Sequence, residues 1–306
     1  MILANSQIYP KAFKNTSDLL DILEKRGLSL IDRDFAFDIL GKIGYYRLSA
    51  YFIPFYENKD YFITHTTFRD IYELYEFDRE LRVVIFKYLE QIEIALRAKI
   101  SNTHAKYFGA FGYLEDKNSL NREMKSNNGV LFDEFMDKIE LEKSRSNEVF
   151  IKHIREKYNS DELPIWALVE ILSFGTLSKF YALLPKYIKK EIISSFGLIL
   201  DIKVFQNWLI ALTLVRNTCA HHSRIWNRCF TPAFKYPKKM KEFLNPSVKT
   251  NQIFFALSVM LVLLKDSGLK EQIILLLKKY PKIDESKMGF LPDWQGLYPW
   301  YSLECL

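Results

Sequence analysis

Residues that interrupt or cross-link a polypeptide are scarce in this sequence. Its 306 residues include 11 glycines, 10 prolines and 3 cysteines. So few glycines and prolines argue against a loop-rich or low-complexity chain. Three cysteines, an odd number, do not make a disulfide framework, and this favours a reducing compartment such as the cytoplasm.

Long apolar segments are also missing. The first residues, MILANSQIYPKAF, lack a basic segment followed by an apolar core, so no signal peptide is evident. The longest apolar run, residues 253–264, is too short to span a bilayer and is followed by Lys265 and Asp266. We interpret this run as a buried core helix, and we expect a cytoplasmic protein that has no membrane partner.

The sequence lacks the common motifs of nucleotide-dependent and hydrolytic enzymes. It has no glycine-rich phosphate loop, no dinucleotide-binding fingerprint and no nucleophile elbow, and nothing in it points to a cofactor. What is abundant is apolar and aromatic: 49% of the residues are hydrophobic and 15% aromatic, which excludes a disordered chain. The net charge of +6 is compatible with a polyanionic partner but does not establish one.

Helical periodicity runs through the chain, and no alternating strand pattern persists. Residues 67–107 contain neither glycine nor proline and carry acid–base pairs at i,i+4, such as Glu93 with Arg97. This pair falls on the more apolar side of the expected helix. We expect the charged stripe to which it belongs to be a solvated face, whereas an inward-facing Glu93–Arg97 pair would hint at function. Residues 201–227 form a second long helical pattern. The sequence therefore predicts an all-α fold.

The string RNTCAHHSRIWNR, residues 216–228, concentrates residues that carry chemistry. A metal site is one interpretation, because zinc is bound by the residue types found at Cys219, His221, His222 and Cys229. Adjacent histidines on a helix diverge by about 100°, however, so both are poorly placed to reach one ion. The paired ligand spacings of zinc modules are also absent. No metal ligand is therefore assigned.

An arginine–histidine pair is the second interpretation of the same string. Arg216 and His221 fit the spacing R-x4-H, although a helix would place them about 140° apart. Asn217 and His221 share a face at i,i+4, which Arg224 and Arg228 would extend if the helix continued. Two copies of this helix facing each other across a dimer would bring the separated groups together. A basic helix end that merely docks on the core remains the third interpretation.

Such a set of side chains suits RNA cleavage. When a ribose 2′-OH attacks its own phosphate, a group must move protons, and imidazole titrates near neutral pH. Guanidinium groups hold the phosphate and stabilise the charge that develops on it. A side-chain amide such as that of Asn217 can orient the histidine or the phosphate.

The same string resembles the signature of the Abi family of bacterial abortive-infection proteins, of the AbiD/AbiF type. Three further blocks match in the same order: IGYYRLSAYFIPF at 43–55, LYEFDRELR with IEIALRAKI at 74–100, and PIWALVEILSFGTLSKFY at 164–181. The resemblance covers roughly residues 15–235. Four ordered blocks are much more specific than the R-x4-H spacing alone.

The Abi family is similar to the HEPN superfamily of α-helical domains, which typically dimerise and of which many are metal-independent ribonucleases built around R-x4-6-H. This resemblance implies catalytic roles for Arg216, Asn217 and His221, while His222 also satisfies the looser spacing. AbiF-type proteins are linked with toxin–antitoxin behaviour and with small noncoding RNAs. The resemblance thus implies an RNA substrate and a small noncoding RNA that restrains the toxin.

From these observations we expect a HEPN-like helical bundle with additional N- and C-terminal helices. The expected segments are 1–60, a core at 61–235 and C-terminal helices at 236–306. The expected activity is that of a homodimeric endoribonuclease toxin of phage defence, with Glu93 and Arg97 supporting the catalytic residues and RNA contacts from Arg224, Trp226 and Arg228. The alternatives are a catalytically inactive HEPN-type RNA-binding or interaction module and a zinc-stabilised interaction protein.

Overall fold

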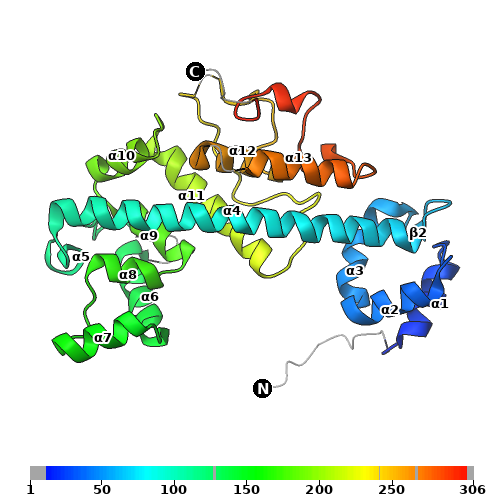
Figure 1. Cartoon of the computed structure of the whole chain (residues 1–306), viewed down its shortest axis with the longest axis horizontal. Helices are drawn as coiled ribbons and strands as arrows, with labels where there is room; N and C mark the ends of the chain where they lie inside the picture. Colours follow the sequence, from blue (N-terminus) through cyan, green and yellow to red (C-terminus); the bar gives the residue numbers. More distant parts are fainter. Residues whose placement is uncertain (1–11, 127–128, 241, 266–267, 302–306) are drawn as a thin grey trace. The chain divides into compact units, whose positions relative to one another are not determined.

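The computed structural model describes residues 12–126, 129–240, 242–265 and 268–301 (Figure 1). Helices dominate these ranges, and the strands in them form two hairpins of two or three residues per strand. The all-α prediction is confirmed. The chain forms two compact units, Met1–Glu80 and Leu81–Leu306. The segment boundaries expected after residues 60 and 235 stay a prediction.

The first unit consists of short helices around an aromatic core. Asp78 is fully buried there, and its carboxylate accepts a hydrogen bond of 2.6 Å from the buried hydroxyl of Tyr51. The elements of the unit are α1 (Thr16–Lys25), α2 (Arg33–Ile43), α3 (Tyr45–Phe52), the 3-10 turn η1 (Ile53–Phe55), the hairpin β1 (Tyr56–Asn58) and β2 (Tyr61–Phe62), and the beginning of α4 (Phe68–Phe108).

The second unit contains the rest of α4 and the helices that follow it. In Figure 1, α10, α12 and α13 lie on one side of α4, and α5 to α8 lie on the other. Helix α11 packs against α9, α10 and α12. The elements are α5 (Gly112–Glu115), β3 (Lys125–Ser126), β4 (Gly129–Val130), α6 (Leu131–Arg145), α7 (Val149–Tyr158), α8 (Ile165–Ile171), α9 (Phe174–Leu183), α10 (Lys186–Ser195), α11 (Ile202–Ala220), α12 (Ile253–Leu264), α13 (Leu269–Lys279), η2 (Glu285–Met288) and η3 (Trp294–Gly296).

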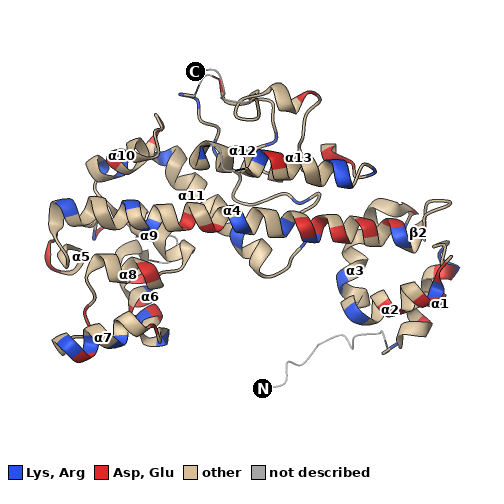
Figure 2. Cartoon of the chain, in the orientation of Figure 1, with Lys and Arg blue, Asp and Glu red and all other residues tan. Residues whose placement is uncertain are grey.

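The apolar run at 253–264 forms α12, whose residues are buried from Ile253 to Leu263. The prediction of a core helix is therefore confirmed. Within the described ranges, no helix has both the length and the apolar character needed to cross a membrane. Charged residues of both signs are interspersed along α4 and α13, so the positive charge is not gathered on one of these helices (Figure 2).

One histidine of α4 is buried without polar partners. The ring of His104 is fully buried, with its centroid 5.2 Å from that of Phe108 and 5.7 Å from that of Phe180. Neither ring nitrogen has a hydrogen-bond partner among the described residues. Burial disfavours the charged imidazolium and lowers the pKa of His104 from 6.5 to about 4.

This environment predicts that acid destabilises the protein through His104. Between pH 6.5 and 4 the unfolded chain takes up a proton that the folded protein does not, so the free energy of unfolding falls as the pH falls. From pH 7.5 to 5 the loss from this group is about 2 kcal/mol. His104→Phe should remove that part of the pH dependence in guanidinium denaturation, whereas His153→Phe, at an exposed site on α7, should not. Equal pH dependence in His104→Phe and wild type would contradict this account.

Candidate active site

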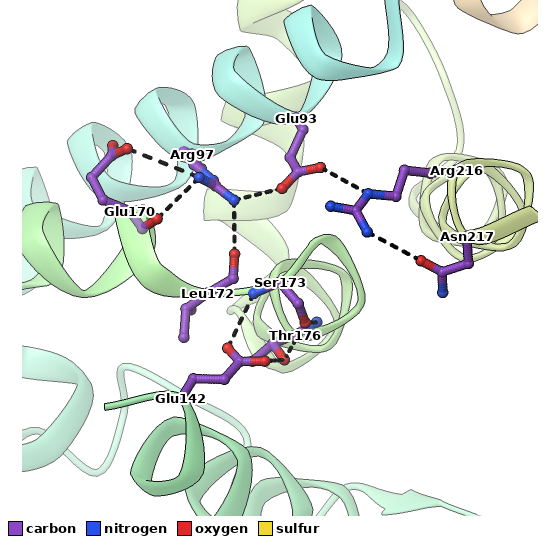
Figure 3. A network of polar contacts seen from close by, with 9 residues as sticks. All are labelled: Glu93, Arg97, Glu142, Glu170, Leu172, Ser173, Thr176, Arg216 and Asn217. Carbon is purple, nitrogen blue, oxygen red and sulfur yellow. Dashed lines mark hydrogen bonds and ion pairs between the residues drawn. The ribbon is translucent and has the colours of Figure 1, made fainter. Parts of the chain in front are cut away.

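The carboxylate of Glu93 joins two arginines from different helices (Figure 3). Glu93 lies on α4 and is 9% exposed. One of its oxygens accepts a hydrogen bond of 2.5 Å from Nη2 of Arg97, and the other lies 3.7 Å from Nε of Arg216 on α11. The structure therefore brings Arg216 to the Glu93–Arg97 pair, although Arg216 lies far from it in the sequence. The pair is mostly buried and is not part of a solvated face.

Arg97 continues this network to the end of α8. Its Nη1 donates to the backbone oxygen of Glu170 at 3.1 Å, and its Nη2 donates to that of Leu172 at 2.8 Å. The last carbonyls of a helix have no partners within the helix, and a cation near them is favourable. Arg97 therefore stabilises the point where α8 ends.

Glu142 of α6 stabilises the beginning of the next helix. Ser173 is the N-cap of α9, and its backbone N–H donates to the Glu142 carboxylate at 3.1 Å. The hydroxyl of Thr176 donates to the other carboxylate oxygen at 2.8 Å. An acidic group is favourable at a helix N-terminus. The break between α8 and α9 is thus held by Arg97 on one side and by Glu142 on the other (Figure 3).

The inner nitrogen of Arg216, Nε, is within ion-pair distance of Glu93 but makes no hydrogen bond to the described residues. Besides the Glu93 contact at Nε, its Nη1 makes a long hydrogen bond of 3.5 Å to the side-chain oxygen of Asn217. The guanidinium carbon lies 5.7 Å from the ring centroid of Phe86. Nη2 makes no hydrogen bond to the described residues. An anion could therefore be bound by the outer edge of this guanidinium.

Arg216 lines a cavity of about 350 Å³ between α4, α8 and α11. Three carboxylates and two guanidinium groups surround it, so its formal charge is −1 (three negative, two positive). An RNA phosphate therefore needs further cations close by. The lining residues are Phe86, Glu90, Glu93, Ile94, Arg97, Glu170 and Arg216.

Helix α11 ends earlier than the sequence suggested. It stops at Ala220, His221 is its C-cap, and His222 has a left-handed backbone with φ of 55°. The N–H of His222 donates to the oxygen of Cys219, and that of Ser223 donates to the oxygen of Thr218, both at 2.9 Å. These two bonds are the Schellman arrangement that ends many helices, usually with glycine at the position of His222. The expectation that this helix reaches residue 227 is therefore wrong. The sequence has no glycine at the position where the helix ends.

This earlier end changes the arrangement of the basic residues. Arg224 and Arg228 lie in the loop after α11 and do not extend the helical face of Asn217 and His221. Nη1 of Arg228 donates to the backbone oxygen of Arg224 at 3.4 Å. Both histidines are exposed. Trp226 is only 4% exposed, so the expectation that its ring contacts RNA does not fit the structure.

The cysteine within the motif and the one that follows it differ in their surroundings: Cys219 is buried and Cys229 is exposed. Among the described residues, no group of three or more His, Cys, Asp or Glu side chains is arranged to hold a metal ion.

Several residues of the site have no motif in the sequence. Phe86, Glu90, Glu93 and Arg97 do follow one another at spacings of four, three and four, which indicates one face of a helix. That signal could have identified the α4 wall of the cavity. Glu142 and Glu170 could not have been found in this way, because their roles depend on contacts between distant segments.

Comparison with known proteins identifies the family. A family model described as Abi-like protein matches residues 38–227, well over half of the chain. The chain belongs to the Abi-like family. The match associates it with abortive infection, a bacterial defence against phage. It spans Glu93, Arg97 and Arg216 and ends one residue before Arg228. No curated protein and no solved structure matches the chain.

The network around Arg97 predicts a large loss of stability in Arg97→Met. This change keeps most of the side-chain volume but leaves the buried Glu93 carboxylate and the α8 carbonyls without Arg97. We expect the free energy of unfolding to fall by about 3 kcal/mol in chemical denaturation. The control is Arg79→Met, because Arg79 is 50% exposed in its ion pair with Glu76 and should cost less than about 1 kcal/mol. Similar losses in both variants would contradict the assigned role of Arg97.

Proposed function

We propose that the protein is a metal-independent endoribonuclease toxin of an abortive-infection system, with Arg216 and His221 as its central catalytic residues. The observation that carries the proposal is the position of Arg216. Its inner nitrogen faces Glu93, its outer edge is available, and the exposed His221 caps the same helix. Membership in the Abi-like family and the resemblance to HEPN ribonucleases support the same activity.

The proposed reaction is an internal transfer at phosphorus. The ribose 2′-oxygen loses its proton and bonds to the adjacent phosphorus, while the bond from phosphorus to the 5′-oxygen of the next nucleotide breaks. One proton leaves the 2′-hydroxyl and another is delivered to the departing 5′-oxygen, and His221 takes part in these transfers. Arg216 binds the phosphate and stabilises its developing charge, and Asn217 orients it.

Glu93 acts in this proposal as a positioning residue. Because its carboxylate lies 3.7 Å from Nε of Arg216, it attracts the guanidinium from the inner side, and the outer edge is left for the phosphate. The acidic cavity makes additional cations necessary, and Arg224 and Arg228 in the loop after α11 supply them in our proposal.

The proposed toxin is a homodimer. The histidine of one copy would then act with the arginine of the other, which would overcome their angular separation on one helix. A small noncoding RNA would restrain the toxin, and both would act in the cytoplasm.

The acidic lining of the cavity favours one second candidate function. In this alternative the protein binds RNA through its other basic residues and does not cleave it.

The proposal predicts RNA cleavage in the presence of excess chelator. Arg216→Ala and His221→Ala should each lower the rate at least about 100-fold, because each removes a group that acts in the transition state. Arg145→Ala and His153→Ala, at exposed positions on α6 and α7, are the matched controls and should cleave like wild type. Unchanged cleavage in Arg216→Ala and His221→Ala would contradict the catalytic role proposed for these two residues. RNA binding by wild type without products would favour the non-cleaving module.

The role of His222 can be tested separately because of its backbone. Glycine favours the left-handed conformation found there, so His222→Gly should preserve the end of α11 while removing the imidazole. We expect the variant to unfold at the same temperature as wild type or higher, and to keep at least about half of the cleavage rate. A loss as large as that of His221→Ala, in a variant of undiminished thermal stability, would assign the catalytic role to His222 as well.

A further inference from the structure

A second hollow lies along α11, on a different side from the cavity of Arg216. This groove has a volume of about 410 Å³ and lies between α9 and α11, with one side formed by the beginning of α6 and the hairpin before it. Six residues matter for its shape: Gly175, Ser178 and Ala182 from α9, and Gln206, Ile210 and Thr213 from α11.

Small side chains on α9 keep the groove open. Gly175, Ser178 and Ala182 are spaced by three and four residues, so they lie on one face of the helix. Ser178 and Ala182 are 5% and 4% exposed and form the floor. Larger side chains at these three positions would fill the space between the helices.

The α11 wall of the groove leads directly to the proposed catalytic residues. Lys203, Gln206, Ile210, Thr213 and Asn217 advance by three or four residues, which at 100° per residue confines them to an arc of about 80°. All five are exposed or half-exposed. At 1.5 Å per residue, Asn217 lies about 6 Å along the helix from Thr213 and about 16 Å from Gln206. His221 follows one turn after Asn217.

The chemistry of the groove suits an uncharged, flat ligand. Ile210 is 43% exposed, which leaves an apolar surface for the face of a ring. The side-chain amide of Gln206 makes no hydrogen bond to the described residues, so both its donor and its acceptor are available.

The only charged groups that line the groove in the described part of the chain neutralise each other. Lys179 and Glu134 form an ion pair of 2.7 Å. Hydrogen bonds from Lys179 and Ser126 lower the pKa of Glu134. The groove therefore offers no net charge to a phosphate. Lys203, an exposed cation outside the groove, lies on the same face of α11, one turn beyond Gln206 and away from Asn217.

We propose that this groove binds a nucleobase of a single-stranded RNA segment next to the cleaved phosphate. In single-stranded RNA the bases can turn away from the strand, place their faces on apolar side chains and form hydrogen bonds at their edges. Ile210 and Ala182 contact the face of the base, and the amide of Gln206 reads its edge. Lys203 contacts the backbone beyond it. This inference rests on the proposed function, because the strand must reach Arg216 and His221.

The test measures RNA binding in a His221→Ala background, in which the probe stays intact. The probe is a fluorescent single-stranded oligoribonucleotide, used intact and as a series in which each position in turn lacks its base. With Gln206 and Ile210 unchanged, the protein should bind one or two abasic probes about tenfold more weakly than the intact probe, the loss of one base contact. With Ile210→Glu added, binding of the intact probe should weaken about tenfold, and the penalty for those abasic positions should disappear.

Two matched controls accompany the test. Ile199→Glu changes an isoleucine that is 82% exposed and does not line the groove, and it should leave binding and the abasic penalties unchanged. Gln206→Ala should weaken binding of some bases more than others, whereas Gln272→Ala on α13 should have no effect. Thermal unfolding of each variant confirms that the fold is intact.

The outcomes separate this inference from the proposed function. If cleavage requires Arg216 and His221 but Ile210→Glu binds and cleaves RNA like wild type, base binding by the groove is wrong and the proposed ribonuclease activity is supported. If the protein binds one or two abasic probes more weakly in the way that depends on Ile210, but never cleaves RNA, base binding by the groove is supported and the proposed catalysis is wrong. A uniform loss of binding for intact and abasic probes, or a change in self-association alone, overturns the base-binding role.

Discussion

Burying a carboxylate is costly unless cations compensate for the water that it loses. Glu93 meets this condition with Arg97 on its own helix and Arg216 on α11, and the rest of the candidate site depends on that arrangement. Arg97 also satisfies carbonyls at the end of α8, and Glu142 accepts hydrogen bonds from the N–H of the N-cap Ser173 and the hydroxyl of Thr176 at the start of α9. Glu93 therefore connects α4 with α11 directly and with the end of α8 through Arg97, and it forms an ion pair with the arginine to which we assign phosphate binding.

The two sides of α11 have different chemistry because its neighbours differ. On the α4 side, Arg216 faces a cavity with an excess of carboxylates, so an anion must compete with Glu93 for the guanidinium or share it. On the α9 side, the groove is neutral and carries Ile210 and an available amide. Asn217 and His221 stand where the stripe of exposed residues reaches the end of the helix. In our proposal, a strand of RNA places a base on one side of α11 and a phosphate on the other.

Helical periodicity is enough to predict the all-α fold and the buried helix at 253–264, because each depends on residues close in the sequence. It places Glu93 and Arg97 on one face of α4, but their burial depends on α8 and α11, which the spacing does not reveal. The end of α11 could not be predicted, because the left-handed position after the helix is occupied by His222 and not by the glycine that usually marks a helix end. The burial of Trp226 and the role of Glu142 depend on contacts between distant segments, which spacing does not reveal. The contact between Glu93 and Arg216 joins two predicted residues, while their catalytic roles stay a proposal.

The chemical ends of the RNA products test the central claim most directly. Purified protein is incubated with an oligoribonucleotide in excess chelator, and the fragments are identified by mass spectrometry. Attack by the 2′-oxygen predicts one fragment that ends in a 2′,3′-cyclic phosphate and another that begins with a 5′-hydroxyl. It also predicts no cleavage where the 2′-hydroxyl is replaced by hydrogen. Fragments with 3′-hydroxyl and 5′-phosphate ends, or cleavage that stops when metal ions are removed, would contradict the assignment to Arg216 and His221.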